Sequence, residues 1–407
     1  MRRLLFSLVV ASSLAIGSLA CSSPGASPPP AAGAAQTSDA ASAQKGGVGE
    51  ITGPYLIPDP KWPQWAYPYP KPGYVWGSQG GVFAESADRV YFANRGELKL
   101  PEKMPPILPA FGISGNFPGF WGALGYQAAN EPIANMANVI VIVDGNGKLV
   151  EAWNQWDKLF EFGRGPHSIY ISPYDPERHV WVVDDFRHAI FKFSHDGKQL
   201  VQTLGVPGEW GDNDDLTHLH RPTSIDWFKD GSFVVCDGYS NTRVVKFDKD
   251  GKPLMKWGTR GKGPGEFNGP HGVAVSANGD RVFVSDRGNS RIQVFDASGT
   301  FIEEWPGVRA NALMMSADEQ HVWVADIGDD RIIEYDLNGH VVQAWGQYGL
   351  RPGYTWCPHQ ISADQNGNLY VAECFNGRQQ KFVPRPGVDP ARLVRARSLM
   401  SSASTTN

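Results

Sequence analysis

A repeated unit of about forty to fifty residues constrains the fold of this chain more than any other feature. One copy reads PHGVAV at 270–275, VFVSD at 282–286, RIQVF at 291–295 and FI at 301–302. Each piece is a short run of β-branched or aromatic residues bounded by Gly, Asn or Asp, which is typical of strands joined by tight hairpins. Four such strands make one blade of a β-propeller, so each copy of the repeat predicts a blade.

An acidic residue at the end of the second predicted strand sets the period. It recurs as Asp184, Asp237, Asp286, Asp326 and Glu373. The spacings of 53, 49, 40 and 47 residues are those of propeller blades. A further unit begins at Val82 and is lengthened by an insertion rich in Pro, Gly and Phe near residues 99–136. The six units predict an all-β, six-bladed β-propeller over residues 49–384, with a solenoid of stacked repeats as the alternative.

Composition agrees with a turn-rich β protein and excludes other classes. The 46 glycines and 31 prolines are too many turn formers for a helical bundle, and 12% aromatic residues are too many for a disordered chain. The net charge of −5 offers no basic surface, so we expect no nucleic-acid partner. We expect a monomer.

The chain ends are predicted to lie outside the propeller. Arg2 and Arg3 precede an apolar run and then small residues, which indicates a secretory signal peptide over residues 1–20. Residues 21–48, rich in Ala, Ser and Pro, predict a linker, and residues 385–407 predict a flexible tail. Cys21 follows the signal directly, so lipidation and membrane attachment at Cys21 compete with ordinary signal-peptidase cleavage. Both routes predict an extracytoplasmic protein, whether periplasmic, on the cell surface or secreted.

Three histidines stand at the head of the first strand in alternate units. They are His167, His271 and His359, whereas the matching residues of the other units are Gly81, Thr223 and Asn311. First strands line the central channel of a propeller, so we expect the histidines about 120° apart around one axis. Three facial histidines with an open fourth position are the ligand set of a catalytic zinc. The alternative is that they are hydrogen-bonded loop residues.

Two arginines and a tyrosine stand just after the second-strand acidic position. Arg95 and Arg287 directly follow this position in units 1 and 4, and in unit 3 Tyr239 comes after Asp237 and Gly238. A buried arginine near a metal is costly unless it meets an anion, so the pair favours a substrate that bears a carboxylate. Ion pairs between blades are the alternative.

With these residues in place, the chain resembles the peptidyl-α-hydroxyglycine α-amidating lyases, the lyase half of the peptide-amidating system. The most specific stretches are DGYSNTRV at 237–244, PHGVA at 270–274 and DRGNSRIQ at 286–293. The resemblance implies a six-bladed propeller of NHL-type repeats with zinc bound by the three histidines. It also implies that Tyr239 is the catalytic tyrosine and that Arg95 and Arg287 are the active-site arginines.

The chain departs from the family pattern at two places. The resemblance implies a structural calcium held by the carbonyl groups of Val82 and Ile169, but Gln360 replaces the third ligand, an aspartate. A neutral amide offers calcium less charge than a carboxylate. Cys357 replaces a methionine near the third histidine, and a thiolate there would become a fourth zinc ligand and close the site.

The resemblance also implies a reaction. The C–N bond of a carbinolamide such as a peptidyl-α-hydroxyglycine is cleaved to an amide and glyoxylate, with Tyr239 as general base, Arg287 assisting it and Arg95 holding the substrate carboxylate. Two other functions compete with this one. The first is a non-enzymatic extracytoplasmic propeller that binds a protein or glycan, and the second is a calcium-dependent propeller hydrolase or lactonase.

Overall fold

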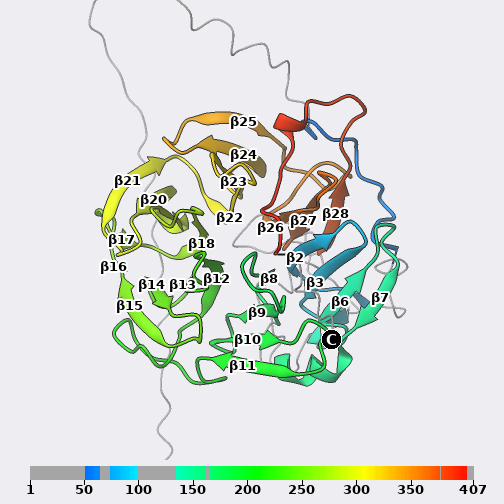
Figure 1. Cartoon of the computed structure of the whole chain (residues 1–407). Coiled ribbons are helices and arrows are strands. Elements are labelled where there is room, and N and C mark those ends of the chain that lie inside the picture. Colours follow the sequence, from blue (N-terminus) through cyan, green and yellow to red (C-terminus); the bar gives the residue numbers. More distant parts are fainter. Residues whose placement is uncertain (1–50, 65–73, 100–133, 162–164, 376, 401–407) are drawn as a thin grey trace, which may run out of the picture. The chain divides into compact units, whose positions relative to one another are not determined.

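The structure, a computed structural model, describes residues 51–64, 74–99, 134–161, 165–375 and 377–400. Within these residues six sheets surround a common axis, which confirms the six-bladed β-propeller (Figure 1). The predicted signal peptide, the linker with Cys21, and nearly all of the 99–136 insertion lie outside the described residues. None of the helices described is long and apolar enough to cross a membrane.

In every blade the strands run outward from the axis and pair antiparallel (Figure 1). Blade 1 consists of β2 (Gln79–Ser86), β3 (Arg89–Asn94), β6 (Ile140–Val143) and β7 (Leu149–Ala152). Blade 2 consists of β8 (Ser168–Ile171), β9 (Val180–Asp184), β10 (Ala189–Phe193) and β11 (Leu200–Leu204). Blade 3 consists of β12 (Pro222–Trp227), β13 (Phe233–Asp237), β14 (Arg243–Phe247) and β15 (Pro253–Trp257). Blade 4 consists of β18 (Pro270–Val275), β19 (Val282–Asp286), β20 (Arg291–Phe295) and β21 (Phe301–Pro306). Blade 5 consists of β22 (Ala310–Met315), β23 (His321–Asp326), β24 (Arg331–Asp336) and β25 (Val341–Trp345). Blade 6 consists of β26 (Pro358–Ala363), β27 (Leu369–Glu373) and β28 (Arg378–Phe382).

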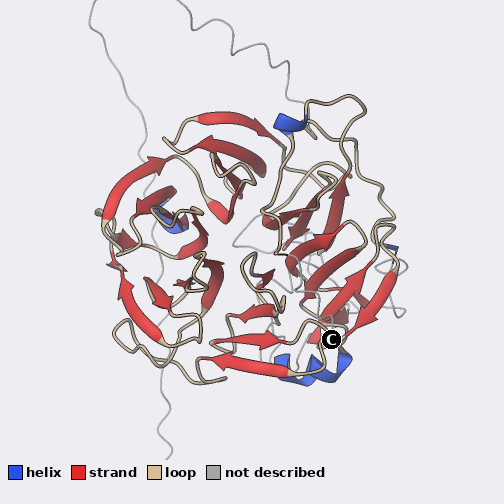
Figure 2. Ribbon diagram, in the orientation of Figure 1, coloured by secondary structure: helices blue, strands red, loops and turns tan. Residues whose placement is uncertain are grey.

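Short elements decorate the blades (Figure 2). A small sheet joins β1 (Tyr74–Trp76), β4 (Glu97–Lys99) and β5 (Ala134–Asn135), and a parallel pair joins β16 (Thr259–Arg260) to β17 (Glu266–Phe267). The described helices are 3-10 turns, namely η2 (Asn154–Phe160), η3 (Arg287–Asn289) and η4 (Pro390–Arg392).

The repeat forms strands because each inner strand is covered on both faces by neighbouring blades. All five residues of β19 are buried, as expected for the continuous run VFVSD, whereas the outer strand β21 alternates between buried or partly buried residues and exposed ones. A tight turn joins β20 to β21, in which the Asp296 side chain accepts from the N–H groups of Ser298 and Thr300, and Gly299 takes a φ of 79°.

The hydrophobic core is divided among the interfaces between blades. Six apolar clusters each join two neighbouring blades. Between blades 3 and 4, for example, Val234 and Val244 pack against Val273 and Val284. Burying a side chain of this size stabilises the fold by about 1.5–3 kcal/mol, so each interface holds two blades in fixed positions around the axis.

The two ends of the propeller meet and close the ring. β26 of blade 6 lies beside β2 of blade 1 (Figure 1). Tyr55, before blade 1, forms a β-bridge with Pro384, after blade 6, and its hydroxyl accepts from the N–H of Val394. A solenoid would leave these ends apart, so this alternative is excluded.

Residues 385–400 differ from the flexible tail predicted over 385–407. Leu393 and Val394 are buried in the cluster between blades 5 and 6, and Arg397 pairs with Glu319 and donates to the carbonyl of Val275. Burial of the two apolar residues and these polar contacts hold the segment against the blades. Residues 401–407 lie outside the described residues.

Candidate metal centre

The first strands of blades 2, 4 and 6 bring the three predicted metal ligands together. His271 lies on β18, His359 lies on β26, and His167 directly precedes β8. All three side chains are buried, and one ligand nitrogen from each lies within 4.8 Å of the others. The ring centroids are 4.8, 4.5 and 5.3 Å apart. This spacing suits three imidazoles around one metal ion.

Main-chain carbonyl groups of the intervening blades orient the histidines. The Nδ1 atoms of His167, His271 and His359 lie 2.7, 2.7 and 2.6 Å from the carbonyl oxygens of Thr223, Asn311 and Gly80. Because a carbonyl oxygen only accepts, Nδ1 carries the proton in each ring and Nε2 keeps its lone pair for a metal.

A β-bulge at the head of the first strand explains this arrangement and corrects one residue. In blade 1 the bulge falls between Gln79 and Gly81, and Gly81 pairs with Ala93. The residue that matches the histidines is therefore Gly80 and not Gly81. Equivalent irregularities contain Thr223, His271, Asn311 and His359. A bulge re-aims a residue of a strand, so the bulges account for the approach of these five residues to the axis, whereas His167 directly precedes β8.

The buried environment favours the metal-binding form of the histidines. Burial holds the pKa of His271 well below its usual value, and the nearby charges of Arg287, His167 and His359 lower it further. The imidazole of His271 is therefore neutral at neutral pH, which is the form that binds a metal.

Tyr239 joins the histidines from the turn after β13. Its hydroxyl oxygen lies 3.2 Å from Nε2 of His167 and 3.0 Å from Nε2 of His271. Gly238 makes this approach feasible, because a Cβ atom there would lie 1.6 Å from the carbonyl oxygen of Pro270. The phenol thus stands at the same ring nitrogens that would bind a metal.

Two guanidinium groups flank the ring of Tyr239. Cζ of Arg287 lies 5.2 Å from the ring centroid, and its Nη1 donates to Oδ1 of Asn311 at 2.8 Å. Cζ of Arg221 lies 4.8 Å from the same centroid, and its Nη2 lies 2.6 Å from the buried carboxylate of Asp185. Two guanidinium groups thus lie next to the phenol ring.

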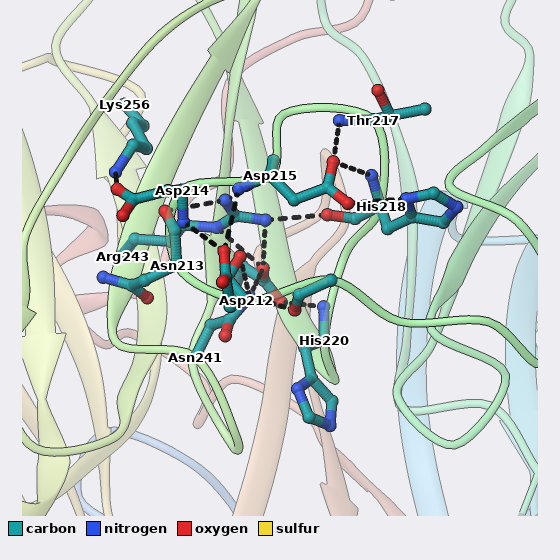
Figure 3. A network of polar contacts seen from close by, with 12 residues as sticks. Asp212, Asn213, Asp214, Asp215, Thr217, His218, His220, Asn241, Arg243 and Lys256 are labelled. Carbon is teal, nitrogen blue, oxygen red and sulfur yellow. Dashed lines mark hydrogen bonds and ion pairs between the residues drawn. The ribbon is translucent and has the colours of Figure 1, made fainter.

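Arg221 is a site residue that the sequence interpretation missed. Its loop is fixed by buried Arg243, which donates to the carbonyl groups of Asn213 and His218 and pairs with Asp237 (Figure 3). A signal was present, because Asp185 occupies the position that is Arg95 or Arg287 in other units, and a buried carboxylate needs a cation.

Arg95 lies beside the first histidine. Its side chain is buried after β3, and its Nε donates to the carbonyl oxygen of Pro166 at 3.1 Å, next to His167. The Arg95 charge also acts on blade 2: burial and Asp185 raise the pKa of Asp184 to about 7, and Arg95 opposes this rise. Arg95 therefore links blades 1 and 2 at the metal centre.

Cys357 does not act as a fourth ligand. It forms a disulfide with Cys374, so it has no thiolate to offer a metal. The two residues meet because Pro358 and Glu373 pair in the register of β26 and β27, which places their outer neighbours opposite each other. The three histidines thus keep the open position that a catalytic metal needs.

The residues carried over for calcium do not fit that ion. Val82 is buried on β2, and Ile169 lies on β8. The Oε1 atom of Gln360 accepts from the N–H of Ile169, at 3.1 Å, so its Nε2 faces and donates to the Ile169 carbonyl oxygen at 2.7 Å. The hydrogen-bonded amide therefore uses the carbonyl group that a calcium ion would need.

Calcium is expected to leave the stability of the protein unchanged. Adding the ion should not raise the unfolding temperature in calorimetry, because only a ligand of the folded state shifts it. In the matched variant Gln360→Asp, which restores a carboxylate, calcium is expected to raise the unfolding temperature. A rise in the unsubstituted protein would contradict this account of Gln360.

Comparison with known proteins agrees with the repeat. A family model of the NHL repeat matches residues 267–295. The chain is 34% identical to NHL repeat-containing protein 3 of Homo sapiens over 42% of this chain and 49% of that protein. It is 35% identical to a probable peptidyl-α-hydroxyglycine α-amidating lyase of Caenorhabditis elegans over 37% of this chain and 44% of that protein.

A longer match is to peptidyl-α-hydroxyglycine α-amidating lyase 1 of Drosophila melanogaster, with 26% identity over 70% of this chain and 56% of that protein. The chain thus spans about half the length of these relatives. The chain is thus a six-bladed β-propeller that matches the NHL repeat over residues 267–295 and is similar to proteins named as peptidyl-α-hydroxyglycine α-amidating lyases.

Proposed function

We propose that the protein is a zinc-dependent lyase that cleaves the carbon–nitrogen bond of a carbinolamide such as a peptidyl-α-hydroxyglycine. The observation that carries the proposal is the meeting of three buried, carbonyl-oriented imidazoles with a tyrosine hydroxyl between two guanidinium groups. Relatives named as amidating lyases support the substrate class. The predicted signal over 1–20 supports an extracytoplasmic site of action, with Cys21 as a membrane attachment point.

The donor set fits zinc. Nε2 of His167, His271 and His359 would hold the ion, since three neutral imidazoles with no thiolate or carboxylate among them form a known catalytic zinc site. A zinc ion bound there would supply a Lewis acid that makes the substrate hydroxyl more acidic.

Tyr239 is the proposed proton carrier. Its phenolate oxygen takes the proton of the substrate hydroxyl, and the electron pair of that O–H bond becomes the new C=O bond of glyoxylate. The C–N electron pair leaves on nitrogen, which takes the proton back from Tyr239 and becomes the amide. Arg221 and Arg287 favour the phenolate that begins this cycle.

The arginines are also proposed to bind the substrate. The carboxylate next to the reacting carbon needs a cation in a buried site, and Arg95 and Arg287 both lie at the metal centre. A guanidinium group holds a carboxylate with paired hydrogen bonds and so fixes the orientation of the reacting carbon.

A binding module is the second candidate function. NHL repeat-containing protein 3 is similar over a comparable part of the chain, and its name states a repeat without an activity. A binding module needs neither a bound metal nor turnover.

Metal analysis of the purified protein, together with glyoxylate release from an α-hydroxyglycine peptide, tests the proposal. We expect about one zinc per chain and equal amounts of amide and glyoxylate. A folded protein without zinc would reject the zinc lyase and favour the binding module. Zinc without glyoxylate would keep the metal site and reject the substrate.

A further inference from the structure

A cleft of about 240 Å³ borders the site on the side of Tyr239 and Arg287. Its other walls include Arg260 at the end of β16 and Arg309 just before β22, both of them exposed. The volume is below the about 300–1,000 Å³ typical of a pocket for a whole ligand. The cleft therefore suits one part of a substrate whose reacting end lies at Tyr239.

The walls of the cleft are positively charged. Three arginines line it, and its other lining residues are Gly238, Tyr239, Thr242, Asn268, Gly269 and Gly288, none of which is acidic. Like charges that share a small cleft repel one another, and an anion in the cleft would relieve this repulsion.

The three arginines also differ from the repeat arginines. Arg243, Arg291, Arg331 and Arg378 each pair with the acidic residue of their own blade. Over the described part of the chain, no such ion pair forms at Arg260, Arg287 or Arg309. Neutral acceptors hold two of them: Arg260 donates to the carbonyl oxygen of Ser240 at 3.2 Å, and Arg287 donates to Asn311. Their positive charge is therefore available to a ligand.

We propose that the cleft is a second anion subsite, in which Arg260 and Arg309 select a negatively charged group in the acyl part of the substrate. This inference rests on the proposed lyase function. The first carboxylate, next to the reacting carbon, is common to all α-hydroxyglycine substrates and confers no selectivity among them. An acidic side chain directly before the hydroxyglycine, such as glutamate, would place a second carboxylate in the cleft.

Paired peptides that carry glutamate or glutamine before the α-hydroxyglycine test the subsite. We expect kcat/KM about tenfold higher for the glutamate peptide, and loss of this preference in Arg260→Gln and Arg309→Gln. Arg309→Glu should reverse it in favour of a lysine peptide. Arg351→Gln, an exposed arginine outside the cleft, is the matched control. Equal rates for the two peptides, or equal losses for both in the variants, would overturn the proposal.

Binding measurements separate this inference from the lyase proposal. The same peptide pair ending in glycine lacks the reacting hydroxyl, and its affinity is measured by calorimetry. If turnover is absent but the glutamate peptide binds more tightly and Arg309→Gln removes the difference, the subsite stands and the lyase proposal fails. If glyoxylate forms equally from both peptides and both glycine forms bind equally, the lyase stands and the subsite fails.

Discussion

Replacing His271 by alanine is expected to remove the metal and the activity together. Its Nε2 is one of the three nitrogens proposed to bind the ion, and two imidazoles cannot hold the ion at an open facial site. Loss of an outer-shell partner alone costs about 10–100-fold in metal affinity, so loss of a ligand should cost at least about a hundredfold. Metal content by mass spectrometry and glyoxylate release should fall in parallel.

A surface histidine gives the control for this substitution. His340 is exposed and pairs with Asp336 in a turn, so His340→Ala should keep both the metal and the activity. Circular dichroism should show that the His271→Ala protein keeps its strands, because the interfaces between blades do not depend on the histidines. Full metal content in this variant would mean that the ion lies elsewhere.

The blades and the histidine triad could be predicted because both follow from the positions of residues within the repeat. The period of the acidic residue marks each second strand, and the position of a residue in the repeat fixes its place in the blade. The units of the repeat must be aligned with one another, however, and this alignment is uncertain by one residue. A bulge adds one residue without changing the pattern, so blade 1 was aligned on Gly81 where the structure places Gly80.

Contacts between a blade and its irregular loops were not visible in the repeat. Arg221 reaches Tyr239 because a loop before β12 is pinned by Arg243, and no spacing in the sequence reports that geometry. The disulfide could have been found, since Cys357 precedes the first strand and Cys374 follows the second, positions that meet in an antiparallel pair.

The chain after blade 6 differs from the predicted flexible tail over residues 385–407. Leu393 and Val394 are buried in a cluster that also contains Tyr55. Two apolar residues are enough to hold a short segment when the cluster is already formed by the blades. The repeat ends at residue 384, so it carries no information on how such a segment packs.

Replacing Tyr239 by phenylalanine is expected to lower kcat by about 10²–10⁴ and to leave the zinc in place. The phenylalanine keeps the ring between Arg221 and Arg287 but removes the oxygen that lies 3.0 Å from Nε2 of His271. The three histidines are untouched, so metal content should match that of the unsubstituted protein. This combination distinguishes the proton carrier from a residue that only supports the metal.

The comparison with other tyrosine and arginine variants sharpens this test. Tyr348→Phe, at an exposed tyrosine, should leave kcat unchanged. Arg221→Gln removes one of the two charges beside the ring, so the alkaline pH at which kcat reaches its plateau should rise, because the phenolate then forms less readily. A Tyr239→Phe protein with full metal content and full kcat would place the proton transfer on another group, and an unchanged pH profile in Arg221→Gln would show that this guanidinium does not act on the phenol.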